Sequence, residues 1–141
     1  MILCDTGPLV AIIDPDDRYH KGTVELIASL GAAYLITTVP CLTEAFYFLY
    51  KFGGWNAQRQ VWLALETQSL QVDDFLTDDL PRIAQLMEQY RDAPIDFADA
   101  SLVALAERTG IRKLLTIDRH FYSYRLKDGG FLEILFPEIE R

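Results

Sequence analysis

The chain has 141 residues, of which 50% are hydrophobic and 24% charged, and its formal net charge at pH 7 is −8. This apolar content excludes a disordered chain, and the length fits one domain spanning residues 1–141. No apolar run approaches the roughly 18 residues of a membrane span, and no signal peptide is recognised, so we expect a cytoplasmic protein. The acidity argues against nucleic acid as a partner, because phosphate binding favours Lys and Arg.

Hydrophobic periodicity divides the chain into alternating strands and helices. Short apolar runs predict strands over 2–4, 33–38, 70–75, 113–118 and 131–136. Helical spacing predicts helices over 7–14, 20–30, 40–52, 56–67, 77–90 and 96–110. This alternation predicts an α/β fold with a mainly parallel sheet and helices on both faces.

Turn and cap residues define several helix ends. Two consecutive glycines, Gly53 and Gly54, should end one helix, and Gly110 should end another. Thr77 or Asp78 is suited to cap the helix over 77–90, and Asp96 to cap the one over 96–110.

Cysteine and histidine are scarce. The two cysteines, Cys4 and Cys41, sit in apolar segments without metal-ligand spacing, and we interpret them as small, reduced core residues. His20 and His120 stand alone in the sequence, and we expect both at the surface. A zinc site is therefore not predicted.

Acidic residues follow two predicted strands. Asp5 ends the strand over 2–4, and Asp118 ends the strand over 113–118. In open parallel sheets, ligands bind beyond the carboxyl ends of the strands. We therefore expect these two carboxylates on one edge of the sheet.

Two further acids lie on apolar faces of predicted helices. Asp99 is followed at helical spacing by Leu102 and Val103, and Glu44 is followed by Tyr47. An unpaired charge on such a face is costly. Taken singly, each acid could be a structural or partly exposed residue.

Taken together, the acids indicate a cation site. Clustered carboxylates repel one another unless they are protonated or paired, and neither Glu44 nor Asp99 has a basic residue within one turn on its own stripe. Oxygen ligands suit Mg²⁺ or Mn²⁺. Such a cation is apt for phosphodiester hydrolysis, with a nearby carboxylate accepting the proton of the attacking water.

Basic residues cluster between positions 112 and 127. They are Arg112, Lys113, Arg119, Arg125 and Lys127. Two interpretations stay open: a solvated surface with uneven charge, or a rim that contacts phosphates.

Four acidic segments resemble, in order, the motifs of PIN-domain ribonucleases, and most of all those of the VapC toxins of VapBC toxin–antitoxin pairs. The segments are "ILCDTGPLVAIID", "TVPCLTEAFYFL", "DFADASLVALAERTG" and "LLTIDRHFYSYR". The similarity covers essentially the whole chain.

The resemblance implies a three-layer α/β/α sandwich with a central parallel sheet, and a metal-dependent endoribonuclease. The four acids of the family's motifs match Asp5, Glu44, Asp99 and Asp118, with Asp96 as a further candidate metal ligand. Two small hydroxyl residues beside these acids, Thr6 and Thr116, would orient ligands or a water molecule.

The resemblance also implies partners. It implies an RNA substrate, a homodimer, and a small antitoxin that binds a groove near the site and inserts a basic side chain. The aromatic helix "FYFLYKF" is either part of a dimer or antitoxin surface or ordinary core. Which RNA is cut, and whether one metal ion or two act, stays open.

Other functions fit the sequence less well. A haloacid-dehalogenase-like phosphatase needs a second Asp two residues after the first, where this chain has Gly7. Nucleotide-binding modules need a glycine-rich phosphate loop, and neither common form of it occurs. A PIN-like module that binds RNA or protein without turnover stays an alternative, although it would be expected to have lost one of the acids.

Overall fold

The computed structural model describes residues 1–31, 33–74 and 76–139. Five parallel strands form one sheet in the order β3-β2-β1-β4-β5. They are β1 (Ile2–Cys4), β2 (Leu35–Thr37), β3 (Leu70–Val72), β4 (Lys113–Leu115) and β5 (Glu133–Leu135). The helices are α1 (Thr6–Ile13), α2 (His20–Ser29), α3 (Val39–Glu66), α4 (Leu76–Gln89) and α5 (Phe97–Thr109), with a short 3-10 helix η1 (Arg119–Tyr122).

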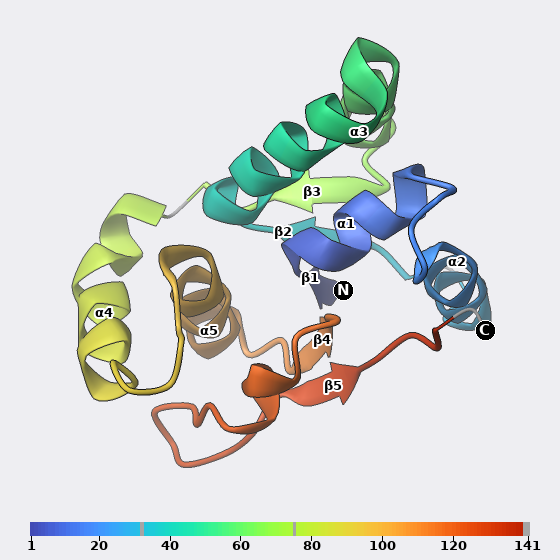
Figure 1. Ribbon diagram of the computed structural model, residues 1–141. Coiled ribbons are helices and arrows are strands. Elements are labelled where there is room, and N and C mark those ends of the chain that lie inside the picture. Colours follow the sequence, from blue (N-terminus) through green and yellow to red (C-terminus); the bar gives the residue numbers. More distant parts are fainter. Residues whose placement is uncertain (32, 75, 140–141) are drawn as a thin grey trace.

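The strand side chains alternate between two apolar cores. Leu3 and Leu114 pack in the core beneath α4 and α5, whereas their neighbours Cys4 and Leu115 pack in the core with α1 and α3. Figure 1 shows α4 and α5 side by side, with α1 and α2 on the other side of the central strands. The expected three-layer α/β/α sandwich with a parallel sheet is confirmed.

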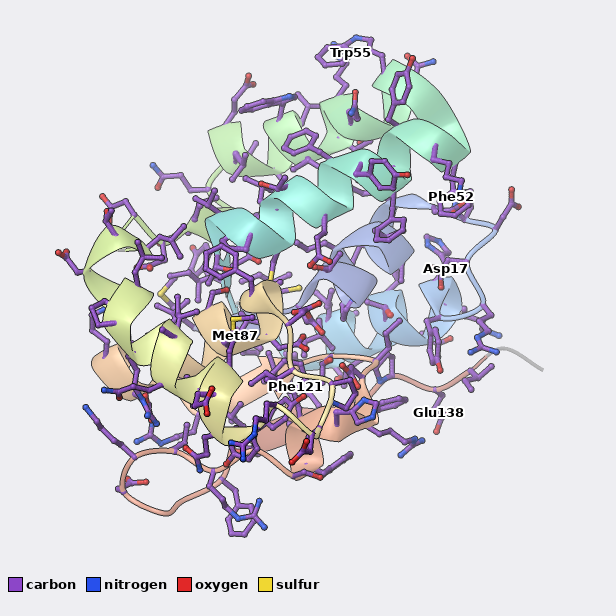
Figure 2. The ribbon with its side chains drawn as sticks, turned by 60° about the vertical axis from the view of Figure 1, so that its left-hand side comes forward. Asp17, Phe52, Trp55, Met87, Phe121 and Glu138 are labelled. Carbon is purple, nitrogen blue, oxygen red and sulfur yellow. The ribbon has the colours of Figure 1, made fainter. Side chains whose placement is uncertain are left out.

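The long helix α3 contains the predicted break. Gly54 has φ 62° and ψ −154°, which lies outside the helical region and is accessible almost only to glycine. Two helical segments therefore meet at this residue, as predicted from the two consecutive glycines. Figure 2 shows Phe52 and Trp55, on either side of the break, at the outer end of α3.

Some predicted boundaries are wrong. Helix α4 begins at Leu76, so Thr77 and Asp78 lie within its first turn instead of preceding it. The third strand ends at Val72, earlier than predicted, and the last residue of the predicted range, Phe75, lies outside the described residues.

Both cysteines are buried core residues with free thiols, as predicted. Burial raises the pKa of the Cys41 thiol to about 12, so it is neutral at physiological pH. His20 differs from the prediction because it is partly buried, with Nδ1 2.6 Å from the carbonyl oxygen of Ala11 in α1.

None of the helices that the structure describes has the length and apolar character needed to cross a bilayer.

Candidate active site

Asp5 is held at the carboxyl end of β1 by two short hydrogen bonds and by a longer one from the Cys41 thiol at 3.9 Å. Its Oδ1 accepts from the backbone N–H of Thr6 at 2.8 Å, which caps α1, and its Oδ2 accepts from Thr116 Oγ1 at 2.8 Å. The residue is only 6% exposed. Burial raises its pKa to about 6, and the two hydrogen bonds oppose this effect. The carboxyl group is therefore fixed in orientation and reluctant to ionise.

Asp118 lies beside Asp5, just beyond the end of β4. Its backbone N–H donates to Thr116 Oγ1 at 3.0 Å, so one hydroxyl group contacts both acidic residues. Its Oδ1 accepts from the backbone N–H of His120 at 2.9 Å and lies 2.7 Å from His120 Nδ1. His120 is exposed, as expected, but this contact with Asp118 was not predicted.

Glu44 reaches the same region from the second turn of α3. Thr6 Oγ1 lies 3.1 Å from Glu44 Oε1, to which it donates a hydrogen bond, and 3.3 Å from the carbonyl oxygen of Cys41. Burial, followed by the charge of Asp96, raises the pKa of Glu44. The predicted inward orientation of Glu44 is thus realised in a half-buried position.

Asp96 and Asp99 form a reciprocal cap at the start of α5. Asp96 Oδ1 accepts from the backbone N–H of Asp99 at 2.8 Å, and Asp99 Oδ2 accepts from the backbone N–H of Asp96 at 3.2 Å. The capping interpretation of Asp96 is confirmed. Asp99 is 7% exposed, so the acid on the apolar stripe is buried, and burial and the charges of Asp96 and Asp5 raise its pKa to about 8.

The four acids are close enough to act on one another. The charges of Asp118 and Glu44 raise the pKa of Asp5, and those of Asp5 and Asp118 raise the pKa of Asp99. No ion pair within the described ranges joins any of the four to Lys or Arg. Among the described residues, acids separated by more than a hundred positions therefore meet at the carboxyl edge without a Lys or Arg side chain to neutralise them, and the one imidazole in contact is that of His120 at Asp118.

The acidic side chains do not enclose a metal ion on all sides. In the part of the chain that the structure describes, no three acidic, histidine or cysteine side chains converge into a ready-made metal site. A closed ligand cage of the zinc or calcium kind is therefore not formed. Mg²⁺ prefers oxygen ligands and typically keeps several waters, so carboxylates that line an open site suit that ion without such a cage.

A groove of about 430 Å³ adjoins the acidic residues. It lies between the starts of α3 and α5, and Glu44 and Asp96 are among its lining residues. The remaining lining residues are Val39, Pro40, Thr43, Leu76, Phe97 and Ala98. Phe97 is 41% exposed there, which leaves an aromatic face available beside the acids.

Comparison with known proteins places the chain in a family. The PIN domain family model matches residues 2–127. The chain belongs to the PIN-domain family. The expectation drawn from the four acidic motifs is thereby confirmed.

Relatives of this PIN domain include VapC proteins. It is 28% identical over 135 residues to Ribonuclease VapC26 of Mycobacterium tuberculosis, covering 95% of this chain and 99% of that protein. The crystal structure of Mycobacterium tuberculosis VapC20, described as a Sarcin-Ricin loop cleaving toxin, matches with a TM-score of 0.73 at 19% identity, over 81% of this chain and 87% of that one. A toxin-antitoxin complex from Klebsiella pneumoniae matches with a TM-score of 0.63 at 18% identity, over 86% of this chain and 90% of that one.

Two of the predicted phosphate-contacting residues lie at the opposite end of β4 from the acids of this PIN domain. Lys113 opens β4 and Arg112 precedes it, whereas the acids lie where the strands end. Arg112 Nη1 donates to the carbonyl oxygen of Ala106 at 2.8 Å, near the C-terminal end of α5. Arg112 and Lys113 therefore lie apart from the acids, and their contact with phosphates stays a prediction.

Arg119 and Arg125 follow Asp118 along the chain and stack on aromatic rings. The guanidinium of Arg119 lies 4.2 Å from the ring centroid of Phe136, and that of Arg125 lies 3.8 Å from that of Phe131. Stacking of this kind leaves the edge of a guanidinium available for phosphate oxygens. These two residues stay candidates for substrate contacts.

Tyr124 was not among the predicted site residues, and it is buried in the same core as Leu3 and Leu114. Its hydroxyl group has no hydrogen-bond partner among the described residues. The segment "HFYSYR" contains three aromatic residues, and only the packing shows that Phe121 and Tyr124 are buried whereas Tyr122 is exposed.

Proposed function

We propose that the chain acts as one PIN-like domain, residues 1–141, and is a metal-dependent endoribonuclease that hydrolyses RNA phosphodiester bonds. The observation that carries this proposal is the position of Asp5. Its carboxylate is fixed by Thr6 and Thr116 and is surrounded by acids that no Lys or Arg among the described residues pairs with. The similarity to Ribonuclease VapC26 supports the assignment of RNA as substrate and of a toxin role in a type II toxin–antitoxin pair.

The residues that would hold Mg²⁺ or Mn²⁺ are Asp5, Asp99 and Asp118, with Glu44 completing the acidic set and Asp96 as a further candidate. Bound there, a divalent cation would supply positive charge next to the scissile phosphate and the leaving oxygen. The raised pKa values of Asp5 and Asp99 come first from burial and then from repulsion by the neighbouring acids, and they fit this assignment because a bound cation would compensate the charge of such carboxylates.

The chain's own residues would divide the remaining work. Thr6 links α1 to Glu44, and Thr116 links Asp5 to the backbone of Asp118, so these hydroxyl groups keep the carboxylates oriented. A carboxylate of this set accepts a proton from the attacking water as the water oxygen attacks phosphorus. The leaving oxygen then departs and takes up a proton.

We assign the RNA to the surface around the acids. Arg119 and Arg125 would contact phosphates, and the groove beside Glu44 would accept a nucleotide, with Phe97 offering an aromatic face to a base. The formal charge of −8 makes these two arginines important, because the rest of the molecule repels RNA.

Two protein partners complete the proposal. A small antitoxin would bind near the acidic groove, in line with the similarity to the toxin-antitoxin complex from Klebsiella pneumoniae. A second copy of the chain would cover the aromatic residues of α3, because exposed apolar patches of this kind mark interaction sites. The most exposed of these are Tyr47, Tyr50, Phe52 and Trp55.

Cleavage of RNA by the purified chain tests the proposed function. We expect cleavage with Mg²⁺ or Mn²⁺ and none in EDTA. Asp5→Asn and Asp99→Asn should each lower the rate by about 10²-fold or more, since several kcal/mol of charge stabilisation are lost. Asp128→Asn is the matched control, because Asp128 pairs with Arg112 in an exposed position away from the acidic edge.

Undiminished cleavage in EDTA, or by Asp5→Asn, would refute the metal-dependent mechanism. If cleavage instead depends on the metal ion and on Asp5, the RNA that is cut can be identified by sequencing the 5′ ends of RNA fragments formed on expression, beside the Asp5→Asn control.

A further inference from the structure

The aromatic ring of Phe136 lies at the same edge of the sheet as the acids. Strand β5 pairs with β4 in parallel, with Leu135 opposite Leu115. The next residue along each strand is Phe136 in one and Thr116 in the other, and the backbone N–H of Thr116 donates to the carbonyl oxygen of Leu135 at 3.2 Å. The hydroxyl group of Thr116 contacts two of the acids. Phe136 therefore follows its strand beside the residue that orients those two acids.

Packing holds Phe136 and the segment that it begins, residues 136–139. Tyr19 meets the Phe136 ring nearly edge-on, with ring centroids 6.1 Å apart and ring planes at 78°. Figure 1 shows the chain crossing from the end of β5 to α2. There, Gly22 lies so close to the segment that a Cβ atom on it would overlap the carbonyl oxygen of Glu138. Because glycine weakens a helix, this close approach explains why α2 has a glycine at that position.

The guanidinium of Arg119 lies over the Phe136 ring, with Cζ 4.2 Å from the ring centroid. No ion pair between described residues uses this guanidinium, although Arg119 directly follows Asp118. An aromatic ring therefore holds the side chain, and the N–H donors at the edge of the guanidinium stay available for an anion. Four other arginines in the described ranges each pair with a carboxylate: Arg82, Arg91, Arg108 and Arg112.

A hollow of about 840 Å³ adjoins this guanidinium. Arg119 and Phe136 are among its lining residues, together with the basic Lys21 and the acidic Glu25 and Glu138. The two acids belong to α2 and to the segment against α2, whereas Arg119 follows Asp118 at the acidic edge. Of this hollow, only the end at Arg119 is therefore suited to a phosphate of a substrate that reaches the acids.

We propose that Phe136 is a positioning residue for the RNA substrate: its ring holds the Arg119 guanidinium at the acidic edge, where the guanidinium binds a backbone phosphate. A long side chain that is already ordered loses less conformational entropy when its ligand binds. An aromatic partner also leaves the guanidinium charge uncompensated, whereas a carboxylate partner would compete with the phosphate. The inference rests on the proposed function, because it assigns Phe136 a role in binding that substrate.

Substitutions at Phe136 separate this role from simple packing. Phe136→Leu keeps an apolar side chain and removes the aromatic face, whereas Phe136→Tyr keeps that face. Arg119→Gln removes the charge, and the double variant shows whether Phe136 acts through Arg119. Phe131→Leu is the matched control, because the Phe131 ring lies against another guanidinium, that of Arg125, with 3.8 Å between the two.

Each full-length variant is compared with wild type by three measurements. Fluorescence anisotropy in EDTA, at several salt concentrations, gives the affinity for a fluorescein-labelled RNA oligonucleotide of mixed sequence, which stays intact without the metal ion. Thermal unfolding reports whether the fold is kept. Titration calorimetry with Mn²⁺ reports whether the acidic site is kept.

We expect Arg119→Gln to weaken RNA binding by about 10-fold, and to lower the slope of log K against log salt by about 0.7. Phe136→Leu should weaken RNA binding by about 2–5-fold with unchanged Mn²⁺ affinity, and Phe136→Tyr should bind RNA like wild type. In the double variant, Phe136→Leu should add nothing to the loss caused by Arg119→Gln. Phe131→Leu should have the same effect in wild type and in Arg119→Gln.

A purely structural Phe136 would give other results. Phe136→Leu would then lower the unfolding temperature and leave RNA affinity unchanged, or it would weaken RNA binding equally in wild type and in Arg119→Gln. Either result would overturn the inference. An unchanged RNA affinity of Arg119→Gln would overturn it too, because the guanidinium would then contact no phosphate.

Failure of the proposed function is seen in different measurements. In that case wild type itself would bind no Mn²⁺, or Asp5→Asn would cleave RNA as wild type does, and the role of Phe136 would fall with it. Metal-dependent cleavage that needs Asp5, together with an RNA affinity that Arg119→Gln lowers and Phe136→Leu leaves unchanged, would reject the role of Phe136 alone.

Discussion

Thr116 Oγ1 donates a 2.8 Å hydrogen bond to Asp5 Oδ2, across a separation of 111 residues in the chain. The same oxygen accepts from the backbone N–H of Asp118 at 3.0 Å. A single hydroxyl group therefore links the ends of β1 and β4, which are neighbours in the sheet. The relative position of two acids assigned to the cation depends on this group.

Thr116→Val should disrupt that link without changing the shape of the side chain. Loss of a hydrogen bond to a buried carboxyl group should lower the free energy of unfolding by about 1–3 kcal/mol, and cleavage should fall with it. The pKa of Asp5 should rise further, because this bond opposes its elevation. Urea unfolding and RNA cleavage, with Thr116→Ser as the matched control, measure both effects. Equal behaviour of the Val and Ser variants would contradict the assigned role.

The pH dependence of stability follows from the buried acids. The pKa of Asp5 is about 6 and that of Asp99 about 8, both above their ordinary value of 3.8. Between about pH 4 and 8 the folded protein thus holds protons that the unfolded chain has released. The free energy of unfolding therefore falls as pH rises through this window, and the full contribution is present only below it.

Urea unfolding at pH 4.5, 6 and 8 in EDTA tests this sign. Wild type should lose stability across the series, and Asp99→Asn should lose less, because its side chain has no proton to release. A wild-type protein that gained stability relative to Asp99→Asn over the same range would show that the sign is wrong.

Basic residues near the acidic edge of the sheet should contribute to RNA binding, whereas those at the opposite edge should not. Arg119→Glu with Arg125→Glu should weaken RNA binding and flatten the slope of log K against log salt, by about 0.7 per lost contact with a single strand. Lys113→Glu is the matched control, because it reverses an exposed charge at the opposite end of β4. Fluorescence anisotropy at several salt concentrations measures the slope. A similar effect of Lys113→Glu would mean that net charge alone governs binding.

Much of the acidic site could be predicted from the sequence because each acid carried a local signal. Asp5 and Asp118 follow apolar runs that end at one edge of a parallel sheet, and Asp99 interrupts a helical stripe. These signals depend on strand direction and helical period, and both can be inferred from residues that are close together in the sequence. Glu44 was recognised in the same way.

The errors concern features that depend on tertiary structure. Arg112 and Arg119 are close in sequence, but β4 passes through the sheet between them and separates them to opposite edges. The hydroxyl of Tyr124 became distinctive only through what surrounds it. On α3, periodicity could not decide whether the aromatic residues were core or surface: Phe46 packs against the core, whereas Tyr47 is 65% exposed.

The exposed aromatic residues of α3 lead to the last prediction. Tyr50 and Phe52 are 65% and 62% exposed. If a second copy covers them, Tyr50→Glu and Phe52→Glu place charges in an apolar interface and should convert a dimer into a monomer. Their helical fold should be unchanged, since neither side chain packs in the core. Sedimentation velocity measures the mass, and Val24→Glu, on the exposed side of α2, is the matched control. An intact dimer of the Phe52→Glu variant, with the same dissociation constant as wild type, would exclude this face as the site of self-association.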